Sequence, residues 1–329
     1  MSNATKIHLL TQYLWPDDAP TGIYAEHVAD ALTLAGRDAV LVGGRGRYRA
    51  GQRRAPASPV TRIDHYEGRR GDLWLTLREY LSVTHAFAAY IRREVRSGDT
   101  VVVVSAPPDT VRLAPLIQRR GARAIYWLQD YHPELVRGLW EYPRPLRAAF
   151  SLGWDRYLAH WDHVVKAAGN LGYDGRNAQV IRNWPTIELG AERPVVPSTA
   201  LYSGNLGHGH DIDSFVEACR ALVSSGFSLT VRADGPGAAK LPACIQRAPL
   251  LASIEELARS YWEAEVHVVA GHPAINRAVF PSKVWNSIAT GRRIVAAGFG
   301  PESRAELKLS QTLDAREHVQ QWVRLLAAS

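Results

Sequence analysis

The chain has 329 residues, of which 46% are hydrophobic and 22% are charged. This length and composition are typical of a folded protein with two domains of ordinary size. Its longest apolar stretches fall far short of the roughly 20 residues that a membrane span needs, and its first residues show no signal-peptide pattern. Two cysteines, Cys219 and Cys244, exclude a disulfide framework or a zinc site of paired cysteines. The small number of cysteines is typical of a reducing compartment, so we expect a cytoplasmic protein. Cys219 lies on a predicted helix, where we expect a buried thiol.

The net charge of +7 is unevenly distributed. Residues 1–196 carry an excess of six positive charges, whereas the remainder carries an excess of one. Such a basic half is compatible with nucleic acid, an anionic substrate, peripheral contact with an anionic membrane, or an arginine-rich solvated surface. Zinc-finger spacing, ribonucleoprotein motifs and an aromatic platform do not occur, so we expect no nucleic-acid partner. Peripheral membrane contact stays open, and the sequence does not indicate an oligomeric state.

Strand-like and helix-like segments alternate along the first half. Ile7–Leu10 is an apolar strand, and Ile23–Ala35 has apolar residues at helical spacing before Gly36 ends the helix. The β-branched run at Thr100–Ser105 is typical of a strand covered on both faces. Further strands are predicted at 39–42, 124–128 and 163–167, and further helices at 73–96, 111–120 and 145–159. This alternation predicts a mostly parallel sheet with helices on both faces.

The pattern lapses at Asn183–Ser198, where prolines and a lack of periodicity mark a linker. It then restarts in the second half. Strands are predicted at 200–203, 228–233, 266–270 and 293–297, and helices at 212–225, 254–261 and 282–290. Ala315–Leu326 is a last amphipathic helix. The sequence therefore predicts two α/β halves joined by a linker.

The loop Gln12–Gly22 joins the first strand to the first helix. Gly22 at such a turn lets a ligand approach the backbone, and the helix N-terminus offers N–H groups to an anion. The alternative is an ordinary turn that needs glycine for its dihedral angles. G-x-G-x-x-G does not occur here and no Walker A sequence occurs in the chain, which disfavours a nicotinamide-binding unit and a P-loop nucleotidase.

Ionisable residues follow the strand that ends at Leu128. Open α/β sheets bind ligands at the carboxyl ends of their strands. A carboxylate at Asp130 or an imidazole at His132 would there position an acceptor hydroxyl or take its proton. The alternative is capping, since Pro133 and Glu134 suit the first turn of a helix that Asp130 would hydrogen-bond.

The loop Leu201–Asp211 contains three glycines, an asparagine and two histidines between a strand and a helix. Its backbone N–H groups and Asn205 would hold a diphosphate, with His208 or His210 as a further donor. Asp211 also begins a D-x-D pattern, but acidic residues at a helix start favour capping over a metal site.

A fourth motif, Phe280–Gly291, begins a helix at Pro281 and Ser282. Lys283 then lies in the first turn, where its charge opposes the helix dipole. A bound phosphate would satisfy both the lysine and the backbone N–H groups, and Arg277 lies just upstream. The position therefore favours an anion site over a solvated lysine.

Together these motifs resemble family-4 type glycosyltransferases of the GT-B fold. The resemblance covers nearly the whole chain and rests on residues 15–22, 127–134, 202–207 with 210, and 281–291; Val180–Pro185 is similar to the family's stretch before the interdomain linker. It implies two Rossmann-like domains facing a cleft. Residues 1–190 would bind the acceptor, residues 198–312 the donor, and a helix within 313–329 would return to the first domain.

The resemblance also implies roles for individual residues. Gly22 would approach the donor phosphates from across the cleft. The other expected donor-binding residues are Asn205, Gly207, His210, Arg277, Ser282, Lys283 and Asn286. The family carries two glutamates eight residues apart near the last of these motifs, and here those positions hold Ala278 and Asn286. Asparagine at the second occurs in a sub-branch that resembles polysaccharide-assembly enzymes.

The expected function is transfer of a sugar from a nucleoside-diphosphate sugar to an acceptor hydroxyl, with retention and with neither cofactor nor catalytic metal. Asp130 or His132 would place the acceptor, and the departing phosphate would take its proton. Two alternatives stay open. One is a non-catalytic sugar-nucleotide-binding partner of another enzyme, which Ala278 favours. The other is a GT-B fold epimerase, which would need more carboxylates and histidines in the second half.

Overall fold

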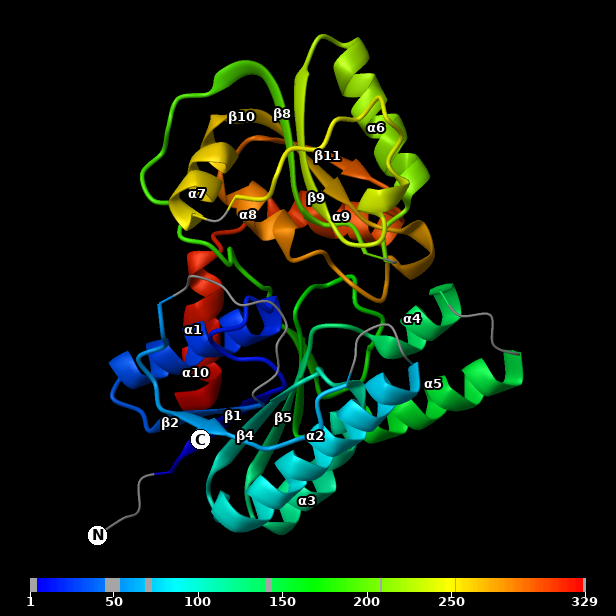
Figure 1. The fold of residues 1–329 in the computed structure, drawn as a ribbon. Helices are drawn as coiled ribbons and strands as arrows, with labels where there is room; N and C mark the ends of the chain where they lie inside the picture. Colours follow the sequence, from blue (N-terminus) through cyan, green and yellow to red (C-terminus); the bar gives the residue numbers. More distant parts are fainter. Residues whose placement is uncertain are drawn as a thin grey trace.

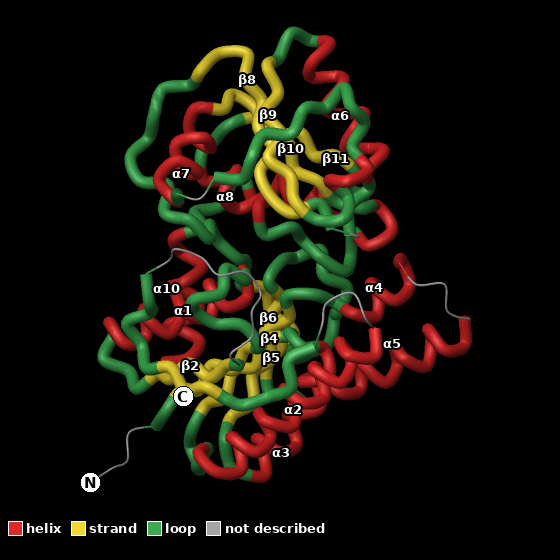
Figure 2. Tube along the Cα trace, in the orientation of Figure 1, coloured by secondary structure: helices red, strands yellow, loops and turns green. Residues whose placement is uncertain are grey.

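The chain folds into two α/β domains, which lie one above the other in Figures 1 and 2. The computed structural model describes residues 5–44, 54–68, 73–139, 144–207, 209–251 and 253–327. Each domain is built around its own parallel sheet. The predicted α/β class with two Rossmann-like domains is therefore confirmed. Over these residues, none of the helices has both the length and the apolar character needed to cross a membrane.

The first domain is centred on a seven-stranded sheet in the order β3-β2-β1-β4-β5-β6-β7. Its strands are β1 (Ile7–Thr11), β2 (Ala39–Gly43), β3 (Val60–Arg62), β4 (Thr100–Val104), β5 (Arg123–Leu128), β6 (His163–Lys166) and β7 (Ala178–Val180). In the central register Leu9 lies opposite both Leu41 and Val102. Every residue of β1 and β4 is buried, as expected of strands covered on both faces.

Helices cover both faces of this sheet (Figure 1). They are α1 (Pro20–Leu34), α2 (Leu73–Glu94), α3 (Ala114–Arg119), α4 (His132–Leu139) and α5 (Arg144–Leu158), with a 3₁₀ turn, η1 (Pro108–Leu113), before α3. The strand order reverses between β1 and β4, so the chain passes from one face of the sheet to the other there. Ligands of open α/β sheets bind outside the carboxyl ends of the strands at such a point.

The second domain has a four-stranded sheet in the order β11-β10-β8-β9. Its strands are β8 (Val196–Asn205), β9 (Ser228–Asp234), β10 (Ala264–Ala270) and β11 (Arg293–Ala297). Its helices are α6 (Ile212–Ser224), α7 (Ile254–Glu263), α8 (Lys283–Ala289) and α9 (Pro301–Ser310), with 3₁₀ turns η2 (Ala238–Lys240) and η3 (Pro273–Ile275). Cys219 is fully buried on α6, as predicted. Asp211 caps this helix by accepting hydrogen bonds from the backbone and hydroxyl of Ser214, which confirms the capping interpretation.

The last helix, α10 (Arg316–Ala327), returns to the first domain and packs against α1 (Figure 1). Trp322 is fully buried, and its ring centroid lies 4.2 Å from that of Trp127 on β5. Arg123 donates a hydrogen bond to the carbonyl of Leu325, and the ring of His318 hydrogen-bonds the carbonyl of Asn183. The predicted return of the C-terminal helix is therefore confirmed.

Strands β3 and β7 and helix α9 have no counterpart in the sequence analysis, and α4 appeared there only in the capping alternative for Asp130. The two strands are three residues each and lie at the edges of the sheet, too short to show a periodic pattern. Helix α9 buries Ser303, Glu306, Leu307 and Ser310. These positions have helical spacing, but three of the four side chains are polar, so the amphipathic signal is hidden. The bounds proposed for the domains stay predictions; the first sheet ends at Val180 and the second begins at Val196.

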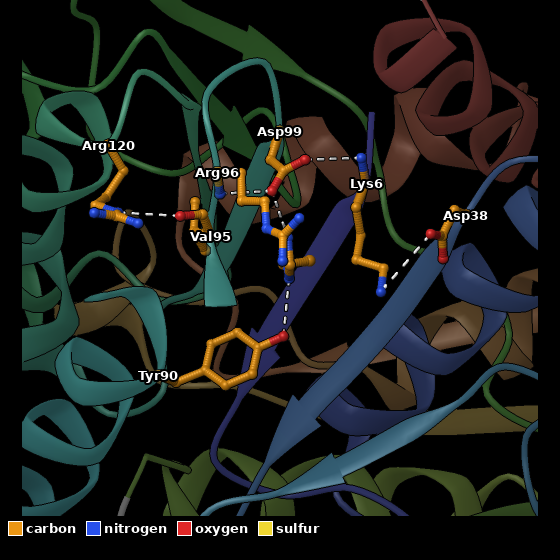
Figure 3. A network of polar contacts seen from close by, with 8 residues as sticks. Lys6, Asp38, Tyr90, Val95, Arg96, Asp99 and Arg120 are labelled. Atoms are coloured by element: carbon orange, nitrogen blue, oxygen red, sulfur yellow. Dashed lines mark hydrogen bonds and ion pairs between the residues drawn. The ribbon is translucent and has the colours of Figure 1, made fainter. Parts of the chain in front are cut away.

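A buried polar network fixes the amino-terminal edge of the first sheet (Figure 3). The Asp99 carboxylate accepts hydrogen bonds from the backbone N–H groups of Lys6 and Arg96. The ring of His8 lies 3.2 Å from the same carboxylate and 2.9 Å from the hydroxyl of Tyr90 on α2. Burial lowers the pKa of His8 against the opposing effect of Asp99. The network therefore ties β1 and α2 to the start of β4.

Candidate functional site

Lys283 lies against the carboxyl end of β8, beside the glycine-rich loop. It is the first residue of α8, as the sequence predicted, with Ser282 at the N-cap. A Cβ atom added to Gly204 would overlap the aliphatic chain of Lys283 and lie 2.7 Å from its Nζ atom. Gly204 also has φ of +144°, which favours glycine. The backbone conformation therefore favours glycine at the end of β8, and a side chain at this position would displace the flexible end of Lys283.

His210 lies within the electrostatic reach of Lys283. Burial, and after it the positive charge of Lys283, lower the pKa of His210 to about 4. The N–H of Gly207 donates a 2.9 Å hydrogen bond to the Nδ1 atom of His210. At this pKa the imidazole is neutral at pH 7. Its Nδ1 atom also lies 3.2 Å from the Gly207 carbonyl oxygen, and in the tautomer in which Nδ1 accepts the Gly207 N–H the proton is on Nε2. These contacts bring Gly207, His210 and Lys283 together, as the motif analysis predicted.

Asn205 is exposed at the end of β8, opposite Asp234 in the neighbouring strand β9. Its side chain lies so close to Gly235 that no Cβ atom would fit there, and Gly235 has φ of +88°. Asn205 thus borders the β9 turn as well as the glycine-rich loop. His208, the alternative histidine of that loop, lies outside the described residues.

A small space of about 10 Å³ and a larger, open hollow lie near this edge of the second sheet. The first is lined by Ser203, His210, His267, Pro281, Lys283 and Ser287 among others. The second adjoins the turn after β9 and is lined by Ala233, Asp234, Gln246, Arg247, Ala248, Pro249 and Leu250. Within the described part of the chain, no group of three or more His, Cys, Asp and Glu residues is placed to hold a metal ion.

Arg277 and Asn286 are not gathered around Lys283. The guanidinium of Arg277 lies 3.5 Å from the Asp174 carboxylate of the first domain and donates a 3.4 Å hydrogen bond to the Gly172 carbonyl. Asn286 is buried, and its Oδ1 atom accepts a hydrogen bond from the backbone N–H of Thr186 in the linker. Arg277 thus joins the two domains, Asn286 joins α8 to the linker, and the expected donor contacts of both residues stay predictions.

Gly22 lies in the first turn of α1, where a Cβ atom would overlap the carbonyl oxygen of Tyr13. The sequence left two explanations for this glycine, a turn conformation and approach to a ligand. The structure adds a third, because the helix packs directly against the backbone of the preceding loop. A donor contact at Gly22 stays a prediction.

Asp130 and His132 both follow the end of β5, as predicted. Burial raises the pKa of Asp130 to about 6. Over the described residues, no hydrogen bond or ion pair to the Asp130 carboxylate is present, so the proposed capping contact is not seen; its backbone N–H donates to the hydroxyl of Ser105 instead. Burial lowers the pKa of His132 to about 4, and its ring packs 4.9 Å from that of Trp154 on α5. Asp130 is thus the better placed of the two to exchange a proton near pH 7.

Sequence reasoning missed the backbone contacts that join the domains. The N–H of Tyr131 donates a 2.7 Å hydrogen bond to the carbonyl of Ala278, and the N–H of Gly172 donates to the carbonyl of Arg277. The buried Asn170 amide donates to the carbonyls of Asn276 and Val279. Backbone hydrogen bonds do not depend on residue type, so no sequence pattern predicts them. They bring the Asp130 segment against the loop that leads into Lys283.

No family model matches the sequence, and no curated protein matches it. The structure is similar to sucrose-phosphate synthase from Thermosynechococcus elongatus, with a TM-score of 0.62 and 15% identity over 98% of this chain and 94% of that one. It is also similar to α,α-trehalose 6-phosphate synthase from Burkholderia multivorans (TM-score 0.59, 14% identity, 99% and 92% covered). A third similar structure is the catalytic domain of starch synthase IV from Arabidopsis thaliana bound to ADP and acarbose (TM-score 0.58, 10% identity, 99% and 95% covered).

The chain has the GT-B fold. Its two parallel sheets and its returning helix α10 are the features that the sequence resemblance predicted. At identities of 10% to 15% the likeness to these structures concerns the fold.

Proposed function

We propose that this protein is a glycosyltransferase that moves a sugar from a nucleoside-diphosphate sugar to an acceptor hydroxyl. The observation that carries the proposal is the close approach of Lys283 to Gly204 beside a neutral, half-buried His210. A lysine ammonium beside the backbone of a glycine-rich loop and an imidazole N–H forms a site suited to binding an anion. The GT-B fold of the chain is compatible with this function but does not by itself establish it.

The donor diphosphate is proposed to bind between Lys283 and the loop Gly204–His210. Lys283 contributes a positive charge, and His210 contributes the N–H of Nε2 in the tautomer whose Nδ1 atom accepts from Gly207. The hollow next to Asn205, at the end of β9, would then receive the nucleoside. Ser282 at the N-cap of α8 adjoins the same position.

The chemical step is the breaking of the bond between the sugar and the diphosphate. Negative charge develops on the departing diphosphate, and Lys283 and the loop donors stabilise it more in the transition state than in the ground state. In the proposed retaining reaction, the departing phosphate oxygen accepts the proton of the acceptor hydroxyl as that hydroxyl attacks the same face. We propose that no metal ion takes part, since Lys283 supplies positive charge to the diphosphate.

The acceptor is proposed to bind at the carboxyl end of β5. The Asp130 carboxylate is free of competing hydrogen bonds from the described residues, so it can accept one from the acceptor hydroxyl. The contact of Tyr131 with Ala278 holds this segment next to the loop preceding Lys283. Orientation of two reactants in this way lowers the entropic barrier to their reaction.

The proposal is tested by incubating the protein with a panel of sugar nucleotides and candidate acceptors and measuring the release of nucleoside diphosphate. We expect release with one donor, loss of release in Lys283→Ala, and slower turnover in Asp130→Asn with nucleotide binding retained. Tight nucleotide binding with neither release nor transfer would contradict the proposal. It would favour a non-catalytic sugar-nucleotide-binding partner instead, a function that the alanine at position 278 supports.

A further inference from the structure

The outward side of α2 carries large apolar side chains. Trp74, Leu77 and Leu81 are 77%, 44% and 51% exposed. Their spacing of three and four residues places them on one side of the helix. The other large hydrophobic residues exposed in the described part of the first domain lie on α1, α5 and β7: Leu34, Leu152, Tyr157 and Val180.

The opposite side of α2 is anchored in the domain. Val83, Phe87 and Ile91 are fully buried. Tyr90 hydrogen-bonds the ring of His8 in the network of Figure 3. The helix is therefore held in one orientation, and the exposure of its outward side is a fixed property of the fold.

The same outward side is basic. With about 3.6 residues per turn, Arg78, His85 and Arg92 fall in the sector of Trp74 and Leu81, and all three are exposed. The acidic residues of α2 are engaged elsewhere. Glu79 accepts hydrogen bonds from the Gln12 side chain and the N–H of Gly68, and Glu94 pairs with Arg93. We call this sector the α2 stripe: Trp74, Leu77, Arg78, Leu81, His85 and Arg92.

We propose that the α2 stripe docks this protein on an anionic lipid surface. Leucine and tryptophan side chains on a helix that lies in the interface plane insert at the boundary between headgroups and acyl chains. Arginines in the same sector attract anionic headgroups. An anionic bilayer matches the apolar and the basic character of the stripe at once, and the positive charge excess of residues 1–196 acts in the same direction.

The test is co-flotation of the full-length protein with vesicles of phosphatidylcholine alone and of phosphatidylcholine mixed with phosphatidylglycerol. The variant is Leu77→Glu with Leu81→Glu, two exposed positions whose change leaves the core intact. The matched control is Leu34→Glu, which is 89% exposed on α1, on the other face of the sheet. No sugar nucleotide is added, so the result is independent of the proposed function.

We expect binding to the anionic vesicles that weakens as salt is raised and is much weaker on phosphatidylcholine alone. The double variant should bind at least about tenfold more weakly. It loses two leucines that would insert into the bilayer and gains two negative charges, and both changes lower the partition constant. Leu34→Glu should bind like the wild type. Absence of wild-type binding, equal binding by the double variant, or self-association that the double variant abolishes would each overturn the proposal. The last result would assign the stripe to a second copy of the chain.

Discussion

The backbone N–H of Tyr131 donates a 2.7 Å hydrogen bond to the carbonyl oxygen of Ala278, across the junction of the two domains. Tyr131 lies between Asp130 and His132, and Ala278 lies five residues before Lys283. This one contact therefore links the candidate acceptor segment to the candidate donor segment. Ala278 is fully buried, so the position where the family that the sequence resembles carries a glutamate is here part of the domain junction.

Replacement of Gly204 by alanine should weaken nucleotide binding. The added methyl group would overlap the Lys283 side chain and displace its Nζ atom. Gly226→Ala is the control, because Gly226 also has a positive φ but a Cβ atom there meets nothing within 4 Å. Both variants should lose about 1 kcal/mol of stability from backbone strain. Isothermal titration with nucleoside diphosphates should show lower affinity for Gly204→Ala alone; equal affinities in the two variants would contradict this geometry.

Introduction of a glutamate at position 278 should destabilise the protein. The glutamate would place a carboxylate in a fully buried position that now holds a methyl group, which should lower the free energy of unfolding by several kcal/mol. Ala278→Ser, a smaller polar change, should cost less. Urea unfolding measures both effects. If Ala278→Glu unfolds at the same urea concentration as the wild type, the position is not the packed junction described here.

Asp130 should give the protein a characteristic pH dependence. Its pKa is about 6 in the folded state because of burial, whereas an unfolded aspartate titrates near 3.8. Between these values the folded state holds more protons than the unfolded state, so this residue lowers stability as pH rises from about 4 to about 6. Asp130→Asn should therefore gain stability relative to the wild type over that window. Thermal unfolding at several pH values checks this, and parallel curves for the two proteins would argue against a buried carboxyl.

The ion pair between Arg182 and Glu306 should contribute strongly to the domain junction. Arg182 Nε and Nη2 lie 2.7 and 3.1 Å from the two carboxylate oxygens, and both side chains are largely buried. Arg182→Ala would leave Glu306 buried and unpaired, at a cost of about 3–5 kcal/mol. Arg324→Ala, which breaks an exposed pair with Glu317, should cost less than about 1 kcal/mol. Equal losses of unfolding free energy in the two variants, measured by urea unfolding, would show that burial does not determine the contribution of the Arg182–Glu306 pair.

The fold was largely predictable from the sequence because its central strands and helices have strong periodic patterns. The run Thr100–Ser105 and the helix at 212–225 were recognisable, since apolar residues occupy their buried positions. Helix α9 was not, because it buries Ser303 and Glu306 where a prediction expects apolar residues. That glutamate pairs in its buried position with Arg182, which lies more than a hundred residues earlier in the chain.

The candidate site was predictable for those residues that lie within a recognisable sequence motif. Lys283 and His210 stood out as polar residues in glycine-rich or helix-initiating segments, and the structure brings them together. Arg277 and Asn286 carried the same kind of signal, yet they contact Asp174 and Thr186 in the domain junction. A residue that lies near a motif in the sequence can point away from the site, because the direction of its side chain depends on contacts with the other domain and the linker.

The most direct test of the donor site is the thermal stability of the protein with and without nucleoside diphosphates, in the wild type, Lys283→Ala and Lys308→Ala. Lys308 is an exposed lysine on α9 and serves as the matched control. A ligand at a hundred times its dissociation constant stabilises the native state by about 2.7 kcal/mol. We predict a rise in melting temperature with one nucleoside diphosphate, kept in Lys308→Ala and lost in Lys283→Ala. No rise with any nucleotide, or an equal rise in all three proteins, would contradict a donor site built on Lys283.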